Sequence, residues 1–299
     1  MENCFKKRKK KIVLYCLYHN KEFINQYRAN NLHLRKLLKL KTLNWLFGAA
    51  LSVYENSRQV LKAPDINYRK FFLFNLFRDF TLNKIDLARR CSVLVASCEK
   101  EASLIRKSLK VLGGGIEVKV VPHSPIFIKS KKQKSSFILV VGRIEKRKNI
   151  VSLIASFDQK RKIRVIAPLG IDAEYNKKFI DLISSKKNVT WSSWLEEDAL
   201  YALASEAESV WSASWFEVMS LFEVDCIYSG IKVVSSENSY LKSEMFFSPS
   251  KGVVVNKPNY SLGRKLVNKT ATPNEVNDPH TMIRSYDRNF VRILSEIKI

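Results

Sequence analysis

From residue 137 to residue 234, short apolar runs alternate with segments of helical periodicity, and this alternation limits the possible folds more than any other feature of the sequence. The apolar runs are rich in Val and Ile, as β-strands are. The predicted strands are 137–141, 163–167, 189–191, 209–212 and 231–234, and the predicted helices are 149–157, 175–184, 196–205 and 221–229. Strands separated by helices pair in parallel, and the helices cover the faces of the sheet. This part of the chain therefore predicts an α/β domain.

A shorter and less regular series of the same kind precedes it. The predicted strands are 12–18, 92–97 and 116–121, and helical periodicity covers 23–47, 82–90 and a segment that ends at Leu112. Three glycines at 113–115 stop that helix and turn the chain. We therefore expect an N-terminal domain over 1–128, a polar linker over 129–136, a C-terminal domain over 137–280 and a last helix over 281–299 that crosses back toward the first domain.

The charge is basic and unevenly distributed. The chain of 299 residues has a formal net charge of +24, and residues 1–130 hold 26 Lys and Arg against 9 Asp and Glu. This excess favours an anionic partner. Segments 34–47 and 69–78 mix Lys and Arg with Leu, Trp and Phe, which suits docking on an anionic membrane, although core helices with a solvated basic face would have the same composition. No known nucleic-acid-binding motif accompanies the charge, so we expect no nucleic-acid partner.

The cysteines and the apolar runs indicate the compartment. Five cysteines, at positions 4, 16, 91, 98 and 226, show no paired spacing, which argues against a disulfide framework and against a zinc site. This usage fits a reducing, cytoplasmic compartment. No apolar run reaches the roughly 20 residues that a transmembrane helix needs. The apolar run 12–18 follows a basic start, but no small-residue cleavage site comes after it, so we interpret it as a strand.

The first candidate site follows the predicted strand 137–141. Gly142 comes directly after this strand, and Arg143 and Lys148 precede the next predicted helix. Glycine lets the backbone approach a ligand closely, and the N-terminus of a helix favours an anion. Two cations at this place would hold a diphosphate and stabilise it as a leaving group. A solvated basic turn is the alternative in a chain so rich in lysine.

The second candidate site contains Glu217 and Asp225, which lie at a loop-to-helix junction. A carboxylate can accept hydrogen bonds from both hydroxyls of a diol, and nucleotide sugars offer such diols. A solvated acidic turn is the alternative for Glu217. Ser220 and Glu223 have the spacing of a capping box, so we expect Glu223 to be structural.

The order and spacing of these segments resemble those of glycosyltransferase family 4. The resemblance covers about residues 90–260 and is clearest from residue 137 onward. The matching positions are Gly142-Arg143 with Lys148 (G-R-x-x-x-x-K), Ser214 with Glu217 (S-x-x-E), Glu217 with Asp225 (E-x7-E, with Asp as the second acid), the strand after Gly230 (G-x-P-V-V) and Glu244, which follows that strand. As a set these motifs are specific, although no single one of them would be.

The resemblance implies a GT-B fold, in which two Rossmann-like domains with parallel sheets face each other across a cleft. It implies a retaining, metal-independent glycosyltransferase that uses no cofactor and takes a UDP- or GDP-type nucleotide sugar as its donor. The implied acceptor is a growing bacterial surface glycan, such as lipopolysaccharide or capsule, that is linked to a lipid. The enzyme would then be cytoplasmic and peripheral on the inner membrane face.

The resemblance also implies roles for single residues. Glu217 would approach the donor sugar as the catalytic residue, and Asp225 would bind the ribose. The donor phosphates would be bound by residues at the two strand ends, namely Gly142, Arg143, Lys148 and the backbone of Met219, Ser220 and Leu221. Glu244 is a further candidate in the cleft. The family often places a His from the N-terminal domain at the cleft, for which His19 and His123 are candidates.

The chain departs from the family pattern at several positions. Val218, Ser220 and Phe222 stand where the family has Gly, Gly and Pro, and Asp225 is one methylene shorter than Glu. The N-terminal domain is also short for the family. These departures fit a second hypothesis, in which a catalytically degenerate GT-B protein serves as an accessory or binding subunit with a protein partner.

Overall fold

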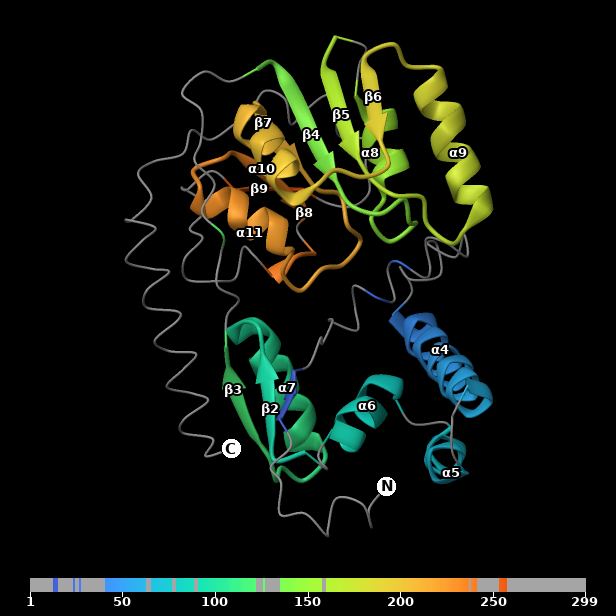
Figure 1. The fold of residues 1–299 in the computed structure, drawn as a ribbon. Coiled ribbons are helices and arrows are strands. Elements are labelled where there is room, and N and C mark those ends of the chain that lie inside the picture. Colours follow the sequence, from blue (N-terminus) through green and yellow to red (C-terminus); the bar gives the residue numbers. More distant parts are fainter. Residues whose placement is uncertain are drawn as a thin grey trace. The chain divides into compact units, whose positions relative to one another are not determined.

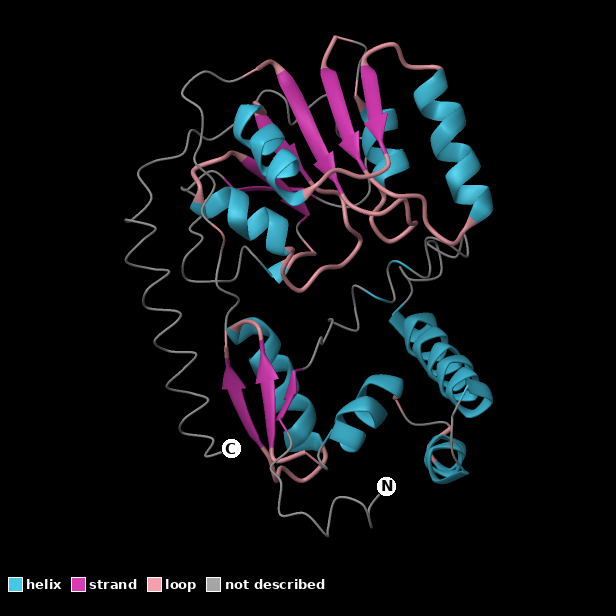
Figure 2. Cartoon of the chain, in the orientation of Figure 1, coloured by secondary structure: helices cyan, strands magenta, loops and turns pink. Residues whose placement is uncertain are grey.

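The computed structural model describes residues 13–15, 24, 27, 41–62, 66–76, 79–88, 91–121, 126, 135–157, 160–236, 238–240 and 253–256. The chain divides into two compact units, of which one takes in Met1–Val121 and Arg292–Ile299 and the other Pro122–Val291. Each unit carries a sheet with helices around it (Figures 1 and 2). All pairs between the described strands are parallel. The prediction of an α/β protein with parallel sheets is therefore confirmed.

The larger unit is built on a six-stranded sheet. Its strands are β4 (Phe137–Val141), β5 (Lys162–Ile166), β6 (Val189–Ser192), β7 (Ser209–Trp211), β8 (Val233–Ser236) and β9 (Val253–Asn256). Its helices are α8 (Ile150–Ser156), α9 (Ala173–Ser184), α10 (Glu197–Glu206) and α11 (Leu221–Tyr228). The strands lie in the order β6-β5-β4-β7-β8-β9. Counted along this unit, that order is third, second, first, fourth, fifth, sixth, which is the order of a doubly wound Rossmann sheet.

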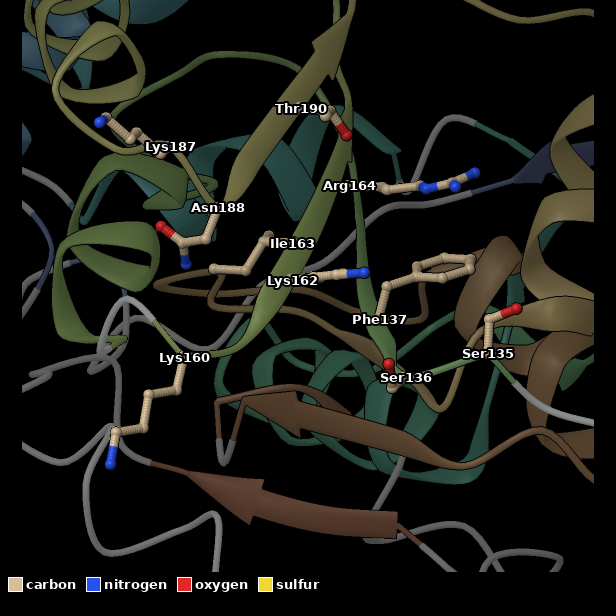
Figure 3. Close-up of a pocket in the computed structure, with 10 residues that line it drawn as sticks. All are labelled: Ser135, Ser136, Phe137, Lys160, Lys162, Ile163, Arg164, Lys187, Asn188 and Thr190. Atoms are coloured by element: carbon tan, nitrogen blue, oxygen red, sulfur yellow. The ribbon is translucent and has the colours of Figure 1, made fainter.

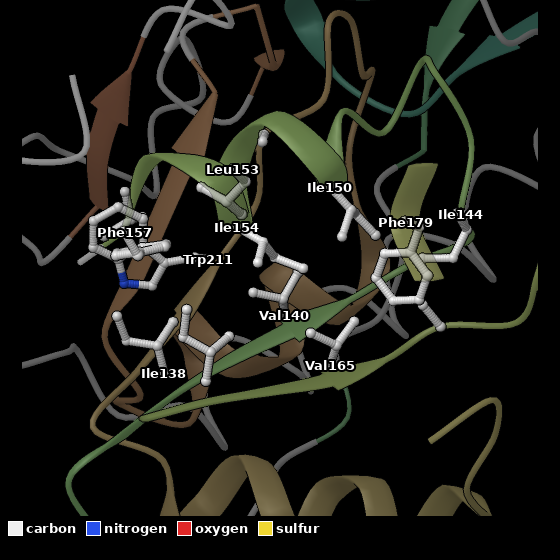
Figure 4. Close-up of a cluster of buried hydrophobic side chains, with 14 of the residues drawn as sticks. Ile138, Val140, Ile144, Ile150, Leu153, Ile154, Phe157, Val165, Phe179 and Trp211 are labelled. Carbon is white, nitrogen blue, oxygen red and sulfur yellow. The ribbon is translucent and has the colours of Figure 1, made fainter. Parts of the chain in front are cut away.

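Side chains of the central strands alternate between two cores, because successive residues of a strand point to opposite faces. Ile138 and Val140 of β4 belong to the core under α8 and α9, whereas Phe137 and Leu139 belong to the core under α10 and α11. Figure 4 shows the first of these cores, with α8 lying across it. Phe179 of α9 is fully buried there, and each large apolar side chain buried in this way contributes about 1.5–3 kcal/mol. The two cores fix the sheet between its helices.

The five strands and four helices predicted from 137 to 234 are all present, with ends that differ by at most two residues. The sixth strand, β9, was not predicted. Its three consecutive valines are the signal that could have indicated it, since β-branched residues favour strands. The predicted helix over 281–299 and most of the predicted linker lie outside the described residues.

The smaller unit has a three-stranded parallel sheet in the order β1-β2-β3. Its strands are β1 (Val13–Tyr15), β2 (Val93–Ala96) and β3 (Glu117–Val120), and its helices are α4 (Lys41–Lys62), α5 (Ile66–Phe74), α6 (Phe80–Ala88) and α7 (Glu99–Val111). The core packs Leu94 of β2 against Ile105 and Leu109 of α7. Glu101 of α7 accepts hydrogen bonds of 2.7 Å from the N–H and the hydroxyl of Ser97, which ties β2 to the helix that follows it.

The predicted helix over 23–47 is corrected at its end, because α4 runs through Gly48 and continues to Lys62. A single glycine costs a helix only about 1 kcal/mol, and the packing of α4 against α5 and α6 offsets that cost. Most of the predicted helix before residue 41 lies outside the described residues. Among the helices that are described, none is long and apolar enough to cross a membrane.

Candidate functional site

The strand order of the larger unit creates one point where the connections diverge. From β4 the chain moves outward to β5 and β6, and from β7 it moves the other way to β8 and β9. The loops that follow β4 and β7 therefore leave the carboxyl edge of the sheet side by side and diverge. In open α/β sheets, ligands bind in the crevice at such a switch point. Both predicted motifs fall on these two loops.

The loop after β4 is firmly held by the loop after β5. The N–H of Gly142 donates to the carbonyl of Ile166 at 3.1 Å, and the N–H of Ile144 donates to that of Pro168 at 2.9 Å. The loop ends at Asn149, which is buried and adopts the left-handed conformation with φ 58° as the N-cap of α8. A Cβ at Gly142 would make only ordinary van der Waals contacts with Ile150 and Lys148. Packing within the protein therefore does not by itself require a glycine there.

The loop after β7 is held between the β4 loop and the segment that follows β8. The N–H of Trp215 donates to the carbonyl of Arg147 at 2.8 Å, and the side-chain amide of Asn238 donates to the carbonyl of Trp215 at 2.8 Å. The backbone of Glu217 forms an isolated bridge with Ser239. The position of Glu217 is thus fixed from two directions. Sequence reasoning missed Asn238 and Ser239, because no local pattern connects them to residue 217.

The carboxylate of Glu217 is the electrostatic centre of the site. Its Oε2 accepts from Nζ of Lys148 at 2.6 Å and from Nη1 of Arg147 at 3.0 Å, and the side chain is 15% exposed. Burial acts to raise the pKa of Glu217, but the two cations and their hydrogen bonds outweigh it, so the pKa lies below its ordinary value. Within the described part of the chain, no group donates to Oε1. Glu217 is therefore an ionised carboxylate with acceptor capacity left.

The structure brings one of the two predicted cations to Glu217 and not the other. Lys148 contacts it, whereas Arg143 pairs with Glu145 at 2.9 Å and is 61% exposed. The second cation on Glu217 is Arg147, whose guanidinium also lies 5.7 Å from the ring centroid of Phe216. Sequence reasoning missed Arg147, although its place beside Lys148 in a basic run was a usable signal.

Asp225 is buried, and the protein itself occupies both of its carboxylate oxygens. Oδ1 accepts the backbone N–H of Ile126 at 2.8 Å, and Oδ2 accepts the hydroxyl of Tyr201 at 2.8 Å. Burial raises the pKa of Asp225, and these two hydrogen bonds oppose the rise only in part. A ribose diol bound at Asp225 would have to compete with these donors. The predicted second acid is therefore present but engaged.

The predicted phosphate-facing backbone lies at the start of α11. Ser220 is the N-cap of this helix and Leu221 its first residue, so the N–H groups of Met219, Ser220 and Leu221 lie where the helix dipole favours an anion. The predicted capping box is wrong, because the Ser220 side chain makes no capping hydrogen bond.

Glu223 is directed away from the start of α11. It is buried between helix and sheet, and it accepts from Ser235 at 2.5 Å and from Ser212. Glu223 is therefore hydrogen-bonded to the two serines and not to the N-terminus of α11. Its role in the interior of the larger unit is structural.

The remaining sequence candidates, His19, His123 and Glu244, lie outside the described residues. Among the residues that are described, no group of three or more His, Cys, Asp or Glu side chains is arranged to hold a metal ion.

No protein-family model matches this sequence, and no curated protein matches it. Solved structures match it in fold. Sucrose-phosphate synthase from Thermosynechococcus elongatus aligns with a TM-score of 0.56 at 13% identity, over 73% of this chain and 61% of its own. The UDP-forming α,α-trehalose-phosphate synthase from Burkholderia xenovorans aligns with a TM-score of 0.54 at 11% identity, over 93% and 86%. TarM aligns with a TM-score of 0.53 at 14% identity, over 74% and 46%.

This chain thus spans less than two thirds of the length of two of these proteins, the first and the last. All three are GT-B glycosyltransferases. At such low identity the likeness concerns the fold alone, and by that likeness this protein is an α/β protein with the fold of the GT-B glycosyltransferases.

Proposed function

We propose that this protein transfers a sugar from a nucleotide sugar of the UDP or GDP type to a growing glycan, with retention of configuration and without a metal ion or cofactor. The observation that carries the proposal is the Glu217 carboxylate, which Lys148 and Arg147 hold at the switch point of a Rossmann sheet. Crevices of this kind bind nucleotides in other α/β proteins. The printed names of two structural neighbours, a sucrose-phosphate synthase and a UDP-forming trehalose-phosphate synthase, fit the same class of reaction.

The proposed step needs stabilisation of a departing diphosphate. The bond from the anomeric carbon to the diphosphate oxygen breaks and the nucleoside diphosphate leaves with the electron pair. An acceptor hydroxyl forms the new bond on the same face, and its proton passes to the leaving phosphate. Lys148, together with Gly142, Arg143 and the first N–H groups of α11, would bind the developing negative charge. Oε1 of Glu217 would accept a hydrogen bond from a hydroxyl of the donor sugar.

A second candidate function is non-catalytic. It is favoured by Asp225, whose two oxygens are occupied by Ile126 and Tyr201, and by the loss of the family's glycines at Val218 and Ser220. A degenerate GT-B protein of this kind would bind a glycan or a protein partner and would turn over no donor. Its nucleotide site would be closed by its own hydrogen bonds.

The deciding experiment is a screen of the purified protein against UDP-, GDP-, ADP- and CDP-sugars, with release of nucleotide and calorimetric binding as readouts. The enzyme proposal expects slow hydrolysis of one donor, and it expects Glu217→Gln and Lys148→Ala to abolish hydrolysis while the fold is retained. Lys146→Ala is the matched control, since Lys146 lies in the same loop and pairs with the partly exposed Asp172 instead. If the protein neither bound nor hydrolysed any donor of the panel, the enzyme proposal would be wrong and the accessory subunit would be the function.

We also propose that the smaller unit docks on the anionic inner face of a membrane, where it would meet a lipid-linked acceptor. Helix α5 presents Ile66, Lys70, Leu73 and Phe74 along one side, because residues spaced by three or four share a face. The three apolar side chains are 63%, 58% and 86% exposed. Apolar groups beside a basic residue suit the interface of an anionic bilayer.

Sedimentation with phosphatidylglycerol vesicles tests this docking. Binding should weaken as salt rises, and the variant Leu73→Ser with Phe74→Ser should bind less well. The control is Ile171→Ser with Ile180→Ser, which removes exposed apolar side chains from the larger unit. No sedimentation at low salt would contradict the proposal, as would an equal loss in the control.

A further inference from the structure

The larger unit has a pocket at the amino edge of its sheet, opposite to the edge that carries Glu217. The pocket has a volume of about 770 Å³. Its lining residues precede or begin the strands β4, β5 and β6 and are shown in Figure 3: Ser135, Ser136, Phe137, Lys160, Lys162, Ile163, Arg164, Lys187, Asn188 and Thr190. Strand β4 has five residues and so spans about 15 Å. This pocket is therefore distinct from the candidate donor site.

The lining is strongly cationic. It contains Lys160, Lys162, Arg164 and Lys187 and no Asp or Glu. The nearby Glu208 is already occupied, because Arg161 binds it at 2.9 Å through both carboxylate oxygens. Within the described ranges of the chain, no ion pair forms on Lys162, Arg164 or Lys187. Several cations that share one concave surface without counter-charges repel one another, and an anion in the pocket would relieve this repulsion.

The geometry around Arg164 is prepared for an anion. Lys162 and Arg164 are two positions apart on β5, so both side chains lie on the same face of the sheet. Phe137 lies on that face as well. The guanidinium of Arg164 stacks on the ring of Phe137 at 4.4 Å from its centroid. Stacking fixes the plane of the guanidinium and leaves its edge, which carries the N–H donors, available to an oxyanion. Thr190, which pairs with Arg164 in the sheet, contributes a hydroxyl donor to the same pocket.

A simpler explanation for basic residues at this edge is compensation of the helix dipoles, since the helices after parallel strands end here. One residue does serve that purpose. Lys186 donates to the carbonyl of Phe157, the C-cap of α8, at 2.7 Å. Lys162 and Arg164 lie on a strand, so the last carbonyls of a helix do not account for them. The helix dipoles therefore explain part of the charge at this edge and leave Lys162 and Arg164 unexplained.

We propose that this pocket is a second anion site, which binds the phosphate groups of a soluble phosphorylated ligand. A phosphate carries about two negative charges and several acceptor oxygens, so it can pair with more than one of the Lys and Arg side chains that line this pocket, which a single carboxylate does less well. The recess favours a discrete group that enters it over a flat lipid surface. The site does not depend on the donor-site assignment, because none of its residues belongs to the loops around Glu217.

Calorimetric titration with inorganic tripolyphosphate at low salt tests the site. All proteins carry Lys148→Ala, so that the candidate donor site contributes as little as possible. The test variant adds Lys162→Glu and Lys187→Glu. The matched control adds Lys107→Glu and Lys177→Glu, which change two exposed lysines outside the pocket by the same charge. Each lost charge-assisted contact weakens binding by about tenfold, so the test variant should bind at least tenfold less tightly and the control should resemble its parent.

Two outcomes would overturn the proposal at this stage. One is unchanged affinity in the test variant, and the other is an equal loss in the control, which would indicate a general charge effect. The milder pair Lys162→Gln with Lys187→Gln guards against misfolding and should also weaken binding. Vesicle sedimentation distinguishes the lipid source of phosphate. If the test variant lost binding to phosphatidylglycerol vesicles but kept its affinity for tripolyphosphate, the pocket would be a membrane contact and the proposal would be wrong.

Discussion

Nζ of Lys148 lies 2.6 Å from Oε2 of Glu217, the same oxygen that the guanidinium of Arg147 reaches at 3.0 Å. Two cations from the loop after β4 thus share one carboxylate oxygen from the loop after β7. The backbone hydrogen bond from Trp215 to Arg147 joins the same two loops. A buried charge is tolerated only when it is paired and hydrogen-bonded, so this pairing lets the loops meet at the switch point.

Replacing Lys148 by methionine should therefore destabilise the fold. Methionine keeps much of the length of the side chain but leaves the largely buried Glu217 with Arg147 alone. Loss of one partner of a partly buried pair should cost about 2 kcal/mol. Urea unfolding measures the change. The control is Lys146→Met, which changes a lysine of the same loop, breaks its more accessible pair with Asp172 and should change the stability little. If both substitutions lowered the stability equally, the pair between Lys148 and Glu217 would not stabilise the fold more than the pair between Lys146 and Asp172 does.

The lowered pKa of Glu217 predicts a definite pH dependence. In the unfolded chain this carboxyl takes up protons near its ordinary pKa of 4.5, whereas in the folded protein it does so only at lower pH. Its contribution to stability is therefore present above pH 4.5 and is lost as the pH falls through the folded pKa. The stability advantage of the wild type over Glu217→Gln should shrink as the pH is lowered from 7 to about 3. A constant difference would show that the pairing with Lys148 and Arg147 does not shift the titration.

Glu223 should show the opposite sign. Burial raises the pKa of this carboxyl, and hydrogen bonds from Ser235 and Ser212 oppose the rise only in part. Because the pKa is raised, the contribution of protonated Glu223 to the stability of the folded protein is complete below the ordinary pKa. This contribution is lost as the pH rises through the pKa of the folded state. Glu223→Gln, which stays neutral, should therefore gain stability relative to the wild type as the pH rises. Unfolding titrations from acid to mildly alkaline pH check this, and a gain toward low pH would refute it.

Tyr201→Phe separates the two views of Asp225. The substitution removes the hydroxyl that donates to Oδ2 of Asp225 at 2.8 Å and keeps the ring that stacks on Phe222. We expect a loss of about 1–2 kcal/mol in stability, because a buried carboxylate loses a donor. If Asp225 binds the donor ribose, the affinity for UDP or GDP should rise at the same time, because the hydroxyl no longer competes.

The control for this substitution is Tyr175→Phe, whose hydroxyl accepts a long hydrogen bond of 3.4 Å from Val151 in the core under α8 and α9. It should leave nucleotide affinity unchanged. A fall in nucleotide affinity in Tyr201→Phe alone would mean that Tyr201 assists the donor instead of competing with it.

The fold of the larger unit could be predicted from sequence because its information is local. A buried strand such as Phe137–Val141 is a continuous apolar run, and a covering helix such as Ala173–Ser184 repeats its apolar residues at helical spacing. The helix α4 was predicted too short because Gly48 is an unfavourable helix residue, and only the tertiary packing of α4 outweighs it.

The site was predictable only in part. Motif spacing indicated Lys148 and Glu217, which the structure brings into contact. The partners of Asp225 were not predictable, since Tyr201 lies 24 positions before it and Ile126 lies 99 positions before it. Pairings over such separations depend on how the chain packs, and no periodicity or capping rule reports them. The same holds for Asn238, which fixes the carbonyl of Trp215.

Gly170 packs against the loop that carries Lys148, and no local sequence pattern indicates this contact. A Cβ on Gly170 would lie 2.3 Å from the carbonyl oxygen of Ile144, which is backbone and cannot turn aside. Gly170→Ala must therefore displace the loop after β4, and we expect a loss of roughly 2–3 kcal/mol, as for overpacking of a closed site.

Gly230→Ala is the matched control for this prediction. Gly230 has φ +70°, and an added Cβ would meet nothing within 4 Å. The cost there is only the strain of the left-handed conformation, about 1 kcal/mol. Thermal and urea unfolding of both variants compares the two costs. Because the loop after β4 also holds Glu217 through Lys148 and Arg147, Gly170→Ala should weaken any nucleotide binding, whereas Gly230→Ala should not. If Gly170→Ala were the milder substitution, the close packing of residue 170 against Ile144 would not exist in solution.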